Sequence, residues 1–230
     1  MPARPLDEAA MAAARSAGAA EAGVWLAGCI GQARPAVRSR AVVMENATVP
    51  SVMSVPEVAA AVDAGRALAA RSAANGVTVL GVEVIGHRAE VPACALTALL
   101  TGRPPGALAR GGLVRAVEDL LARHAGQLTG PLSALRLVGG EAIARAVGVA
   151  LGAGEQGLPF VAEGLGATAA AGIALRIEPA LAPRVRLAGI GPTDAEAALR
   201  SALVLRPLVD GPVGTSAALA TLRRSFSAAG

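Results

Sequence analysis

The sequence contains no lysine and no tyrosine, and its aromatic residues are one tryptophan and two phenylalanines. All 21 basic residues are therefore arginine, which excludes Schiff-base chemistry on a lysine side chain. The net charge of +4 would allow anion binding, but the arginines are spread along the whole chain and few aromatic rings are available to stack on bases. We therefore expect no nucleic-acid partner.

Long apolar runs and cysteine motifs are also missing. No stretch of about 18 or more apolar residues runs without a charge, so we expect no membrane span. Asp7 and Glu8 stand where a signal peptide would have its apolar region, which predicts a cytoplasmic protein. The two cysteines, Cys29 and Cys94, lack CxxC or Cys/His spacing, and we interpret them as small buried hydrophobic residues. We expect neither a metal site nor a cofactor.

The length of 230 residues suits one α/β domain and is too short for two domains of comparable size. We predict a single domain over 1–230, with a helical N-terminal segment, 1–40, packed on it. The predicted order begins with a helical segment over 7–30, broken by Gly18 and Gly23, followed by strand 41–44, helix 54–74, which a Ser54–Glu57 capping box opens, and strand 77–85. It continues with helices 91–100 and 113–125, strand 135–138, helix 142–151, strand 159–162 and helix 166–175. Strand 185–190, a helix capped by Thr193 with Glu196, strand 203–209 and a helix from Thr215 complete it. Strands written as continuous apolar runs between helices predict an α/β fold with a parallel, Rossmann-like open sheet and helices on both faces.

Glycine recurs at the carboxyl ends of the predicted strands. In open parallel sheets ligands bind at these ends, and glycine lets the backbone approach a ligand closely. Five of the six predicted ends contain glycine: 44–46 has none, whereas 81–87, 139–141, 163–164, 189–191 and 210–214 do. The pattern predicts a small-molecule pocket at this edge, although glycine at any single end is explained equally well by turn formation.

Three ionisable residues at these ends are candidates for catalysis. His87 stands on a strand-end loop beside Glu83 and Arg88 and could titrate near neutrality, the alternative being an exposed loop histidine. For Glu83, the alternative to a catalytic role is a surface or ion-paired carboxylate. Glu163 could hold a ribose or order a loop, or simply cap the helix that follows it. Asp210 begins a DGP turn, which accounts for it without a ligand.

Three segments carry a family resemblance: VGGEAIARAVGVALGA at 138–153, LPFVAEGLGATAAA at 158–171 and LRPLVDGPVGTSAALA at 205–220. With segments nearer the front, they resemble in order those of the nicotinate-nucleotide:dimethylbenzimidazole phosphoribosyltransferase family, which activates the lower-ligand base of cobamides. The likeness covers nearly the whole chain. It implies a nucleotide or heterocyclic ligand and either a homodimer or a heterodimer with a paralogue.

The chain departs from the family at two functional segments. Val213 stands where the family carries its general-base Glu, whereas Gly214 and Thr215 match. Residues 81–91 resemble the nucleotide-binding loop, but an acid is replaced at Val82, and residues 87–89 replace the Asn-Thr-Thr that would cradle phosphate. The chain is also shorter than the family between Met44 and Met53. Proton transfer to a positioned general base contributes about 10² to 10⁴ in rate. The resemblance therefore implies that the family's transfer reaction is much slower or lost in a chain with Val213 at this position.

The strand-end pattern and the resemblance together predict three catalytic candidates, Glu83, His87 and Glu163. The predicted ligand-binding residues are Gly81, Gly86, Arg88, Gly139, Gly140, Gly164, Asp210, Val213, Gly214 and Thr215. We favour a divergent family member that keeps its pocket for a different small molecule and has lost the family's transfer reaction. Two alternatives stay open: a non-catalytic partner subunit of an active paralogue, and retained phosphoribosyl transfer to a heterocyclic base with His87 or Glu163 as the base.

Overall fold

The protein, seen in a computed structural model, is described over residues 4–45 and 52–227, and it contains a four-stranded parallel sheet. Residues 46–51, within the segment expected to be shortened, lie outside these ranges. The strands follow each other across the sheet in chain order: β1 (Ser39–Met44), β2 (Val79–Val84), β3 (Phe160–Glu163) and β4 (Val185–Leu187). The predicted α/β fold with an open parallel sheet is confirmed.

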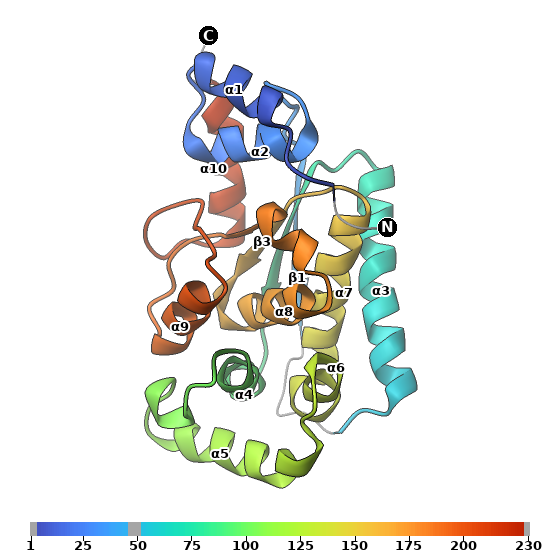
Figure 1. The fold of residues 1–230 in the computed structure, drawn as a ribbon, viewed down its shortest axis with the longest axis vertical. Helices are drawn as coiled ribbons and strands as arrows, with labels where there is room; N and C mark the ends of the chain where they lie inside the picture. The colour runs from blue at the N-terminus through green and yellow to red at the C-terminus, as the bar shows by residue number, and fades with distance from the viewer. Residues whose placement is uncertain (1–3, 46–51, 228–230) are drawn as a thin grey trace.

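Helices connect these strands and extend beyond both ends of the sheet (Figure 1). The α-helices are α1 (Glu8–Ser16), α2 (Glu21–Ile30), α3 (Val55–Ala74), α4 (Glu90–Thr101), α5 (Gly112–His124), α6 (Pro131–Ala134), α7 (Gly140–Glu155), α8 (Gly164–Ile177), α9 (Asp194–Ala202) and α10 (Thr215–Ser227). Short 3-10 helices occupy Pro105–Ala107, Ala125–Gln127 and Pro179–Arg184. The expected break in the segment 7–30 falls at Gly18, which turns the chain between α1 and α2 with a φ of 78°, whereas Gly23 lies inside α2 and does not interrupt it.

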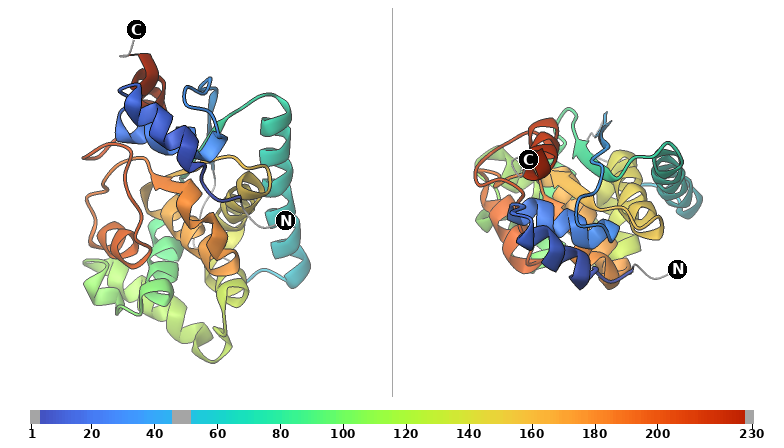
Figure 2. Two further views of the ribbon diagram at one scale, coloured as in Figure 1. Left: turned by 45° about the horizontal axis from the view of Figure 1, so that its top comes forward. Right: turned by 90° about the horizontal axis from the view of Figure 1, so that it is seen from above.

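Side-chain alternation along the strands divides the core between the two faces of the sheet. Leu80 and Val82 belong to the larger cluster, which includes residues of α3, α7 and α8. Val79 and Val161 face the other way, into a cluster with Trp25 of α2 and Leu222 of α10. Helices thus cover both faces, and α3 lies alongside α7 in both views of Figure 2.

Buried polar groups connect the N-terminal helices to the rest of the molecule. Trp25 Nε1 donates to the backbone oxygen of Pro183 over 2.8 Å. The neighbouring Arg184 is only 3% exposed and donates to the backbone oxygens of Arg4, Cys29 and Gly157. Because a buried charge requires such partners, Arg184 holds the first residues of the described chain against the amino end of the sheet.

Both cysteines are buried and free, as their spacing indicates. Burial raises the pKa of the Cys29 thiol to about 12 and that of Cys94 to about 11. Both thiols are therefore protonated at neutral pH, which makes them poor nucleophiles and poor metal ligands.

Two predicted strands are wrong. Leu135–Gly139 forms a π-helical turn that joins α6 to α7, because a short apolar run does not by itself distinguish a strand from a buried helical segment. In 203–209, a single bridge pairs Pro207 with Leu187. Pro207 has no backbone N–H to donate to a neighbouring strand. Val204 has a φ of 53°, which turns the chain away from an extended conformation.

Replacing Val204 by glycine should stabilise the protein by about 0.5–1 kcal/mol. A β-branched residue is strained in the left-handed region, at a cost of about 1–2 kcal/mol, part of which is offset by the extra freedom of glycine in the unfolded chain. The Val204 side chain is 82% exposed, so its loss removes little packing. Urea unfolding of Val204→Gly measures the gain. Val204→Ala keeps the Cβ atom, and an equal gain in that variant would contradict backbone strain as the cause.

Candidate functional site

Two carboxylates lie side by side where β2 and β3 end. Glu83 and Glu163 are register partners in this parallel pair. Alternation places them on the same face of the sheet as Val79 and Val161, which is the face that α10 covers. Both are half-buried. Folding therefore brings together two of the three residues predicted for catalysis.

Glu163 holds the first residue of α10. Its carboxylate accepts from the backbone N–H and from the hydroxyl of Thr215, which is buried. Gly81 allows this close approach, since a Cβ atom added there would lie 2.2 Å from Thr215 Cγ2. Gly81 and Thr215 thus position the helix against the sheet.

Burial raises the pKa of the Glu83 carboxyl above its ordinary value, and the negative charge of Glu163 raises it further. The folded protein therefore holds a proton on Glu83 at pH values where the unfolded chain has released it. Stability then falls as the pH rises from the unfolded pKa of Glu83 to its folded pKa, because the folded state binds more protons in that window.

Glu83→Gln should remove this pH dependence. Below the window both forms carry a neutral side chain and should have similar stability, whereas above it the variant should gain on the wild type because it has no charge to bury. Urea midpoints at several pH values between 4 and 8 compare the two proteins. A stability difference that does not change with pH would contradict the expected effect of ionisation.

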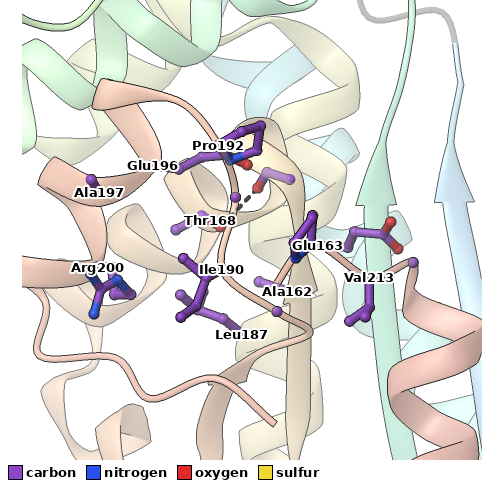
Figure 3. Close-up of a pocket in the computed structure, with 15 residues that line it drawn as sticks. Ala162, Glu163, Thr168, Leu187, Ile190, Pro192, Glu196, Ala197, Arg200 and Val213 are labelled. Carbon is purple, nitrogen blue, oxygen red and sulfur yellow. Dashed lines mark hydrogen bonds between the residues drawn. The ribbon is translucent and has the colours of Figure 1, made fainter. Parts of the chain in front are cut away.

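A cavity of about 360 Å³ opens next to Glu163, between the carboxyl ends of β3 and β4 (Figure 3). The segment from β4 to α9 and the loop 210–214 before α10 form its other walls. Its size falls in the range of pockets for small organic ligands. The lining residues are Ala162, Glu163, Gly164, Thr168, Leu187, Gly189, Ile190, Gly191, Pro192, Glu196, Ala197, Arg200, Pro212, Val213 and Gly214.

Two charged residues of this cavity, Glu196 and Arg200, are absent from the sequence-based prediction. Glu196 accepts from the backbone N–H and hydroxyl of Thr193, at 3.2 and 2.7 Å, and so completes the cap of α9. Arg200 lies in the last turn of the same helix, with its Nε atom buried. The capping pattern predicts α9 itself, but only the position of α9 beside β3 reveals that Arg200 lines a cavity.

The other predicted residues divide between the cavity and its surroundings. Gly164, Val213 and Gly214 line it, as does Glu163. Asp210 is exposed at the start of the closing loop. An exposed loop after β2 carries Gly86, His87 and Arg88, outside the cavity lining.

Gly139 is the last residue of a π-helical turn and Gly140 the first residue of α7, so neither ends a strand. Neither residue lines the cavity. Gly139 packs under Leu135, and Gly140 opens α7 with a φ of 77°. Their structural surroundings explain both glycines.

A second cavity, of about 440 Å³, lies at the opposite edge of the sheet around Arg184. Its buried guanidinium donates four hydrogen bonds to backbone oxygens, including those of Cys29 and Gly157. In residues 4–45 and 52–227, no group of three or more His, Cys, Asp or Glu side chains is placed to hold a metal ion. No helix in these ranges has the length and hydropathy to cross a membrane. The cavity beside Glu163, and not the one around Arg184, lies at the carboxyl ends of the strands, where ligands of open parallel sheets bind.

Comparison with known proteins identifies the family. A family model described as phosphoribosyltransferase matches residues 8–221. The chain is 37% identical over 183 residues to the nicotinate-nucleotide–dimethylbenzimidazole phosphoribosyltransferase of Thermus thermophilus, covering 73% of this chain and 54% of the relative. The chain belongs to the nicotinate-nucleotide–dimethylbenzimidazole phosphoribosyltransferase family. The enzyme of that name from Chlorobium chlorochromatii is 29% identical over 189 residues, covering 76% of this chain and 53% of its own length.

The fold of this family member agrees with a solved structure. The crystal structure of CobT from Thermus thermophilus aligns with a TM-score of 0.79 at 23% identity, over 96% of this chain and 95% of that one. In sequence, however, the chain spans about half the length of the curated relatives that it matches. The sequence comparison establishes the family and the structural comparison establishes the fold. The cavity beside Glu163 lies at the carboxyl ends of the strands of that fold.

Proposed function

We propose that this phosphoribosyltransferase-family protein binds a nucleotide or a heterocycle in the cavity beside Glu163 and that it has lost fast phosphoribosyl transfer. One observation carries the proposal: both carboxylates that line the cavity are engaged in holding helices. Glu163 accepts from Thr215, and Glu196 accepts from Thr193. The closing loop adds Val213 to the lining. Both carboxylates of the cavity are thus committed to holding helices, and Val213 supplies no carboxylate at the position of the family's general base.

A second candidate is retained phosphoribosyl transfer with Glu83 as the general base. Its raised pKa favours this role, because a base is most effective when its pKa lies nearer the working pH. Glu83 also lies beside Glu163 at the carboxyl ends of the strands, although it is not itself among the residues that line the cavity. The names of the relatives describe transfer from nicotinate nucleotide to dimethylbenzimidazole, which defines the reaction to be tested.

The test combines binding and turnover on the same purified chain. Calorimetry with nicotinate mononucleotide and, separately, with 5,6-dimethylbenzimidazole measures binding, and chromatography measures release of nicotinate when both are present. The Thermus thermophilus enzyme serves as the positive control. We expect binding of at least one of the two compounds, with turnover about 10² or more below that of the control.

Two results would change the conclusion. Turnover similar to that of the control, abolished in Glu83→Gln, would establish the second candidate in place of the first. Binding of neither compound would contradict the assignment of the cavity as a site for this class of ligand.

A further inference from the structure

We infer that two copies of this chain associate through the free edge of β1, with the two strands antiparallel and with Val42 facing Val42 across a two-fold axis. The strand order places β1 at one edge of the sheet and β4 at the other. Pairing of the two β1 strands would join the sheets of both copies into one. This surface lies outside the lining of the cavity beside Glu163, so the inference is independent of the proposed function.

The backbone of β1 presents a row of hydrogen-bonding groups at this edge. The even-numbered residues of the strand turn toward β2, as the bond from the Ile85 N–H to the Met44 oxygen shows. Because these groups alternate in direction along a strand, the N–H and C=O groups of Ser39, Ala41 and Val43 point away from the sheet. Within the described ranges, none of these outward groups has a backbone partner. Such an edge is a template for a further strand.

The side chains of β1 do not protect this edge. Free edges are usually protected by a charged side chain, a proline or a bulge. Arg40 is charged, but it donates to the hydroxyl of Ser72 over 3.1 Å and so turns onto α3. The strand contains no proline and pairs with β2 in unbroken register. Ala41 and Val43 are exposed, Val43 to 45%. The edge is therefore both unpaired and apolar.

The apolar side chains favour one register for two antiparallel copies. Outward-directed residues must lie opposite each other if both strands are to exchange hydrogen bonds. With Val42 of each copy at the two-fold axis, Ala41 lies opposite Val43 of the second copy, and the same pair recurs on the other side of the axis. The four exposed side chains then cover one another. This arrangement is closed, since neither copy keeps a free β1 edge.

Charge complementarity identifies the occupant of the edge as a second copy. In this register Ser39 lies opposite Glu45 of the second copy, a residue that is exposed directly after β1. Arg223 of α10 donates to the Ser39 hydroxyl over 2.8 Å, so its guanidinium lies where that carboxylate would approach. The two-fold axis creates this contact twice, once at each end of the paired strands. A strand of another protein would need a carboxylate at the same place, which a second copy supplies through Glu45.

The first experiment measures self-association by sedimentation velocity over a dilution series. It compares the wild type, Val43→Lys and a matched control, Val204→Lys. Val204 is exposed in the segment that approaches β4, at the opposite edge of the sheet. We expect the wild type to dimerise and Val43→Lys to raise the dissociation constant about tenfold or more, because each dimer receives two charges between its paired strands. Val204→Lys should match the wild type.

Disulfide formation tests the register without a charged variant. Ala41→Cys and Val43→Cys are prepared separately and mixed, because directly opposite residues have Cα atoms about 5.5 Å apart, a distance that a disulfide spans. Either variant alone would place its two new cysteines diagonally, more than about 7 Å apart. The native Cys29 and Cys94 are buried and should not react. We expect a disulfide-linked dimer in the mixture and in neither variant alone.

Four outcomes would overturn the inference. A wild type that stays monomeric at about 0.1 mM, well above the dissociation constant of a standard interface, would exclude self-association. Equal dissociation constants for the wild type and Val43→Lys would place the interface elsewhere, and an equal loss in Val204→Lys would reduce the effect to net charge. Equal cross-linking of either cysteine variant alone would contradict the register. Ligand binding by a monomeric wild type would leave the proposed function standing while the dimer fails.

Discussion

Val213→Glu should increase the rate of nicotinate release from nicotinate mononucleotide and dimethylbenzimidazole by about 10² relative to the wild type. Val213 lines the cavity in the loop 210–214, at the position where the family resemblance places a general-base Glu. In the transfer, the bond from the ribose carbon to nicotinate breaks while a benzimidazole nitrogen bonds to that carbon, and the base takes the N–H proton. The new carboxylate would lie near Glu163, whose charge raises its pKa and so improves it as a base. Product chromatography under saturating nucleotide measures the gain.

Val213→Gln is the matched control for this gain. It has the size and polarity of glutamate but cannot accept the proton, so its rate should stay at the wild-type value. The rate of Val213→Glu should also rise with pH as the new carboxyl ionises. A variant that binds both substrates and shows no gain over Val213→Gln would contradict a missing base as the limiting defect.

The sheet and most helices could be predicted because their signals are local. Continuous apolar runs marked all four strands, and the Ser54–Glu57 and Thr193–Glu196 pairs marked the starts of α3 and α9. Each of these capping boxes satisfies backbone N–H groups within four residues of its own segment, so no tertiary information is needed. The apolar run 135–138 carries no comparable signal, since the same residues suit a strand or a buried helix.

The part of the site that could be predicted is the pair of carboxylates at the strand ends, because the carboxyl ends of parallel strands lie at one edge of the sheet. Glu83 and Glu163 lie 80 positions apart in the numbering but pair in register, and parallel pairing at one edge of the sheet was enough to expect them together. The roles of the glycines were not predictable in the same way. Gly81 of β2 allows the start of α10 to approach the sheet closely, although Gly81 and Thr215 lie over 130 positions apart. Nothing near Gly81 in the sequence indicates that Thr215 lies there.

Arg200 illustrates the remaining limit. An arginine in the last turn of a helix is fully explained by its favourable interaction with the helix dipole. Its place in the cavity lining depends on how α9 packs across the end of the sheet, and the lack of an acceptor for its Nε atom among the described residues depends on where the carboxylates of Glu163 and Glu196 are directed. Both facts depend on how β3, α9 and α10 pack together, and no residue near Arg200 in the sequence indicates them.

Gly148→Ala should destabilise the protein by about 3 kcal/mol, near the upper end of the cost of overpacking. Helices α3 and α7 approach each other through glycines on both sides. A Cβ atom at Gly148 would lie 2.0 Å from the backbone oxygen of Val62, and one at Gly65 would lie 2.1 Å from that of Arg145. Backbone atoms within a helix cannot rotate away as a side chain can, so the added methyl group must push the two helices apart. Urea unfolding measures the loss.

Gly112→Ala is the matched control, because a Cβ atom at this first residue of α5 meets nothing within 4 Å. Alanine there should leave stability unchanged or raise it by up to about 1 kcal/mol, through its better helix propensity and the lower entropy of the unfolded chain. Destabilisation confined to Gly148→Ala would therefore come from the contact of α3 with α7. Since α7 also packs on the sheet, separation of the two helices should loosen the support of the strands without changing any residue that lines the cavity. Retained stability in Gly148→Ala would contradict the close approach of these two helices.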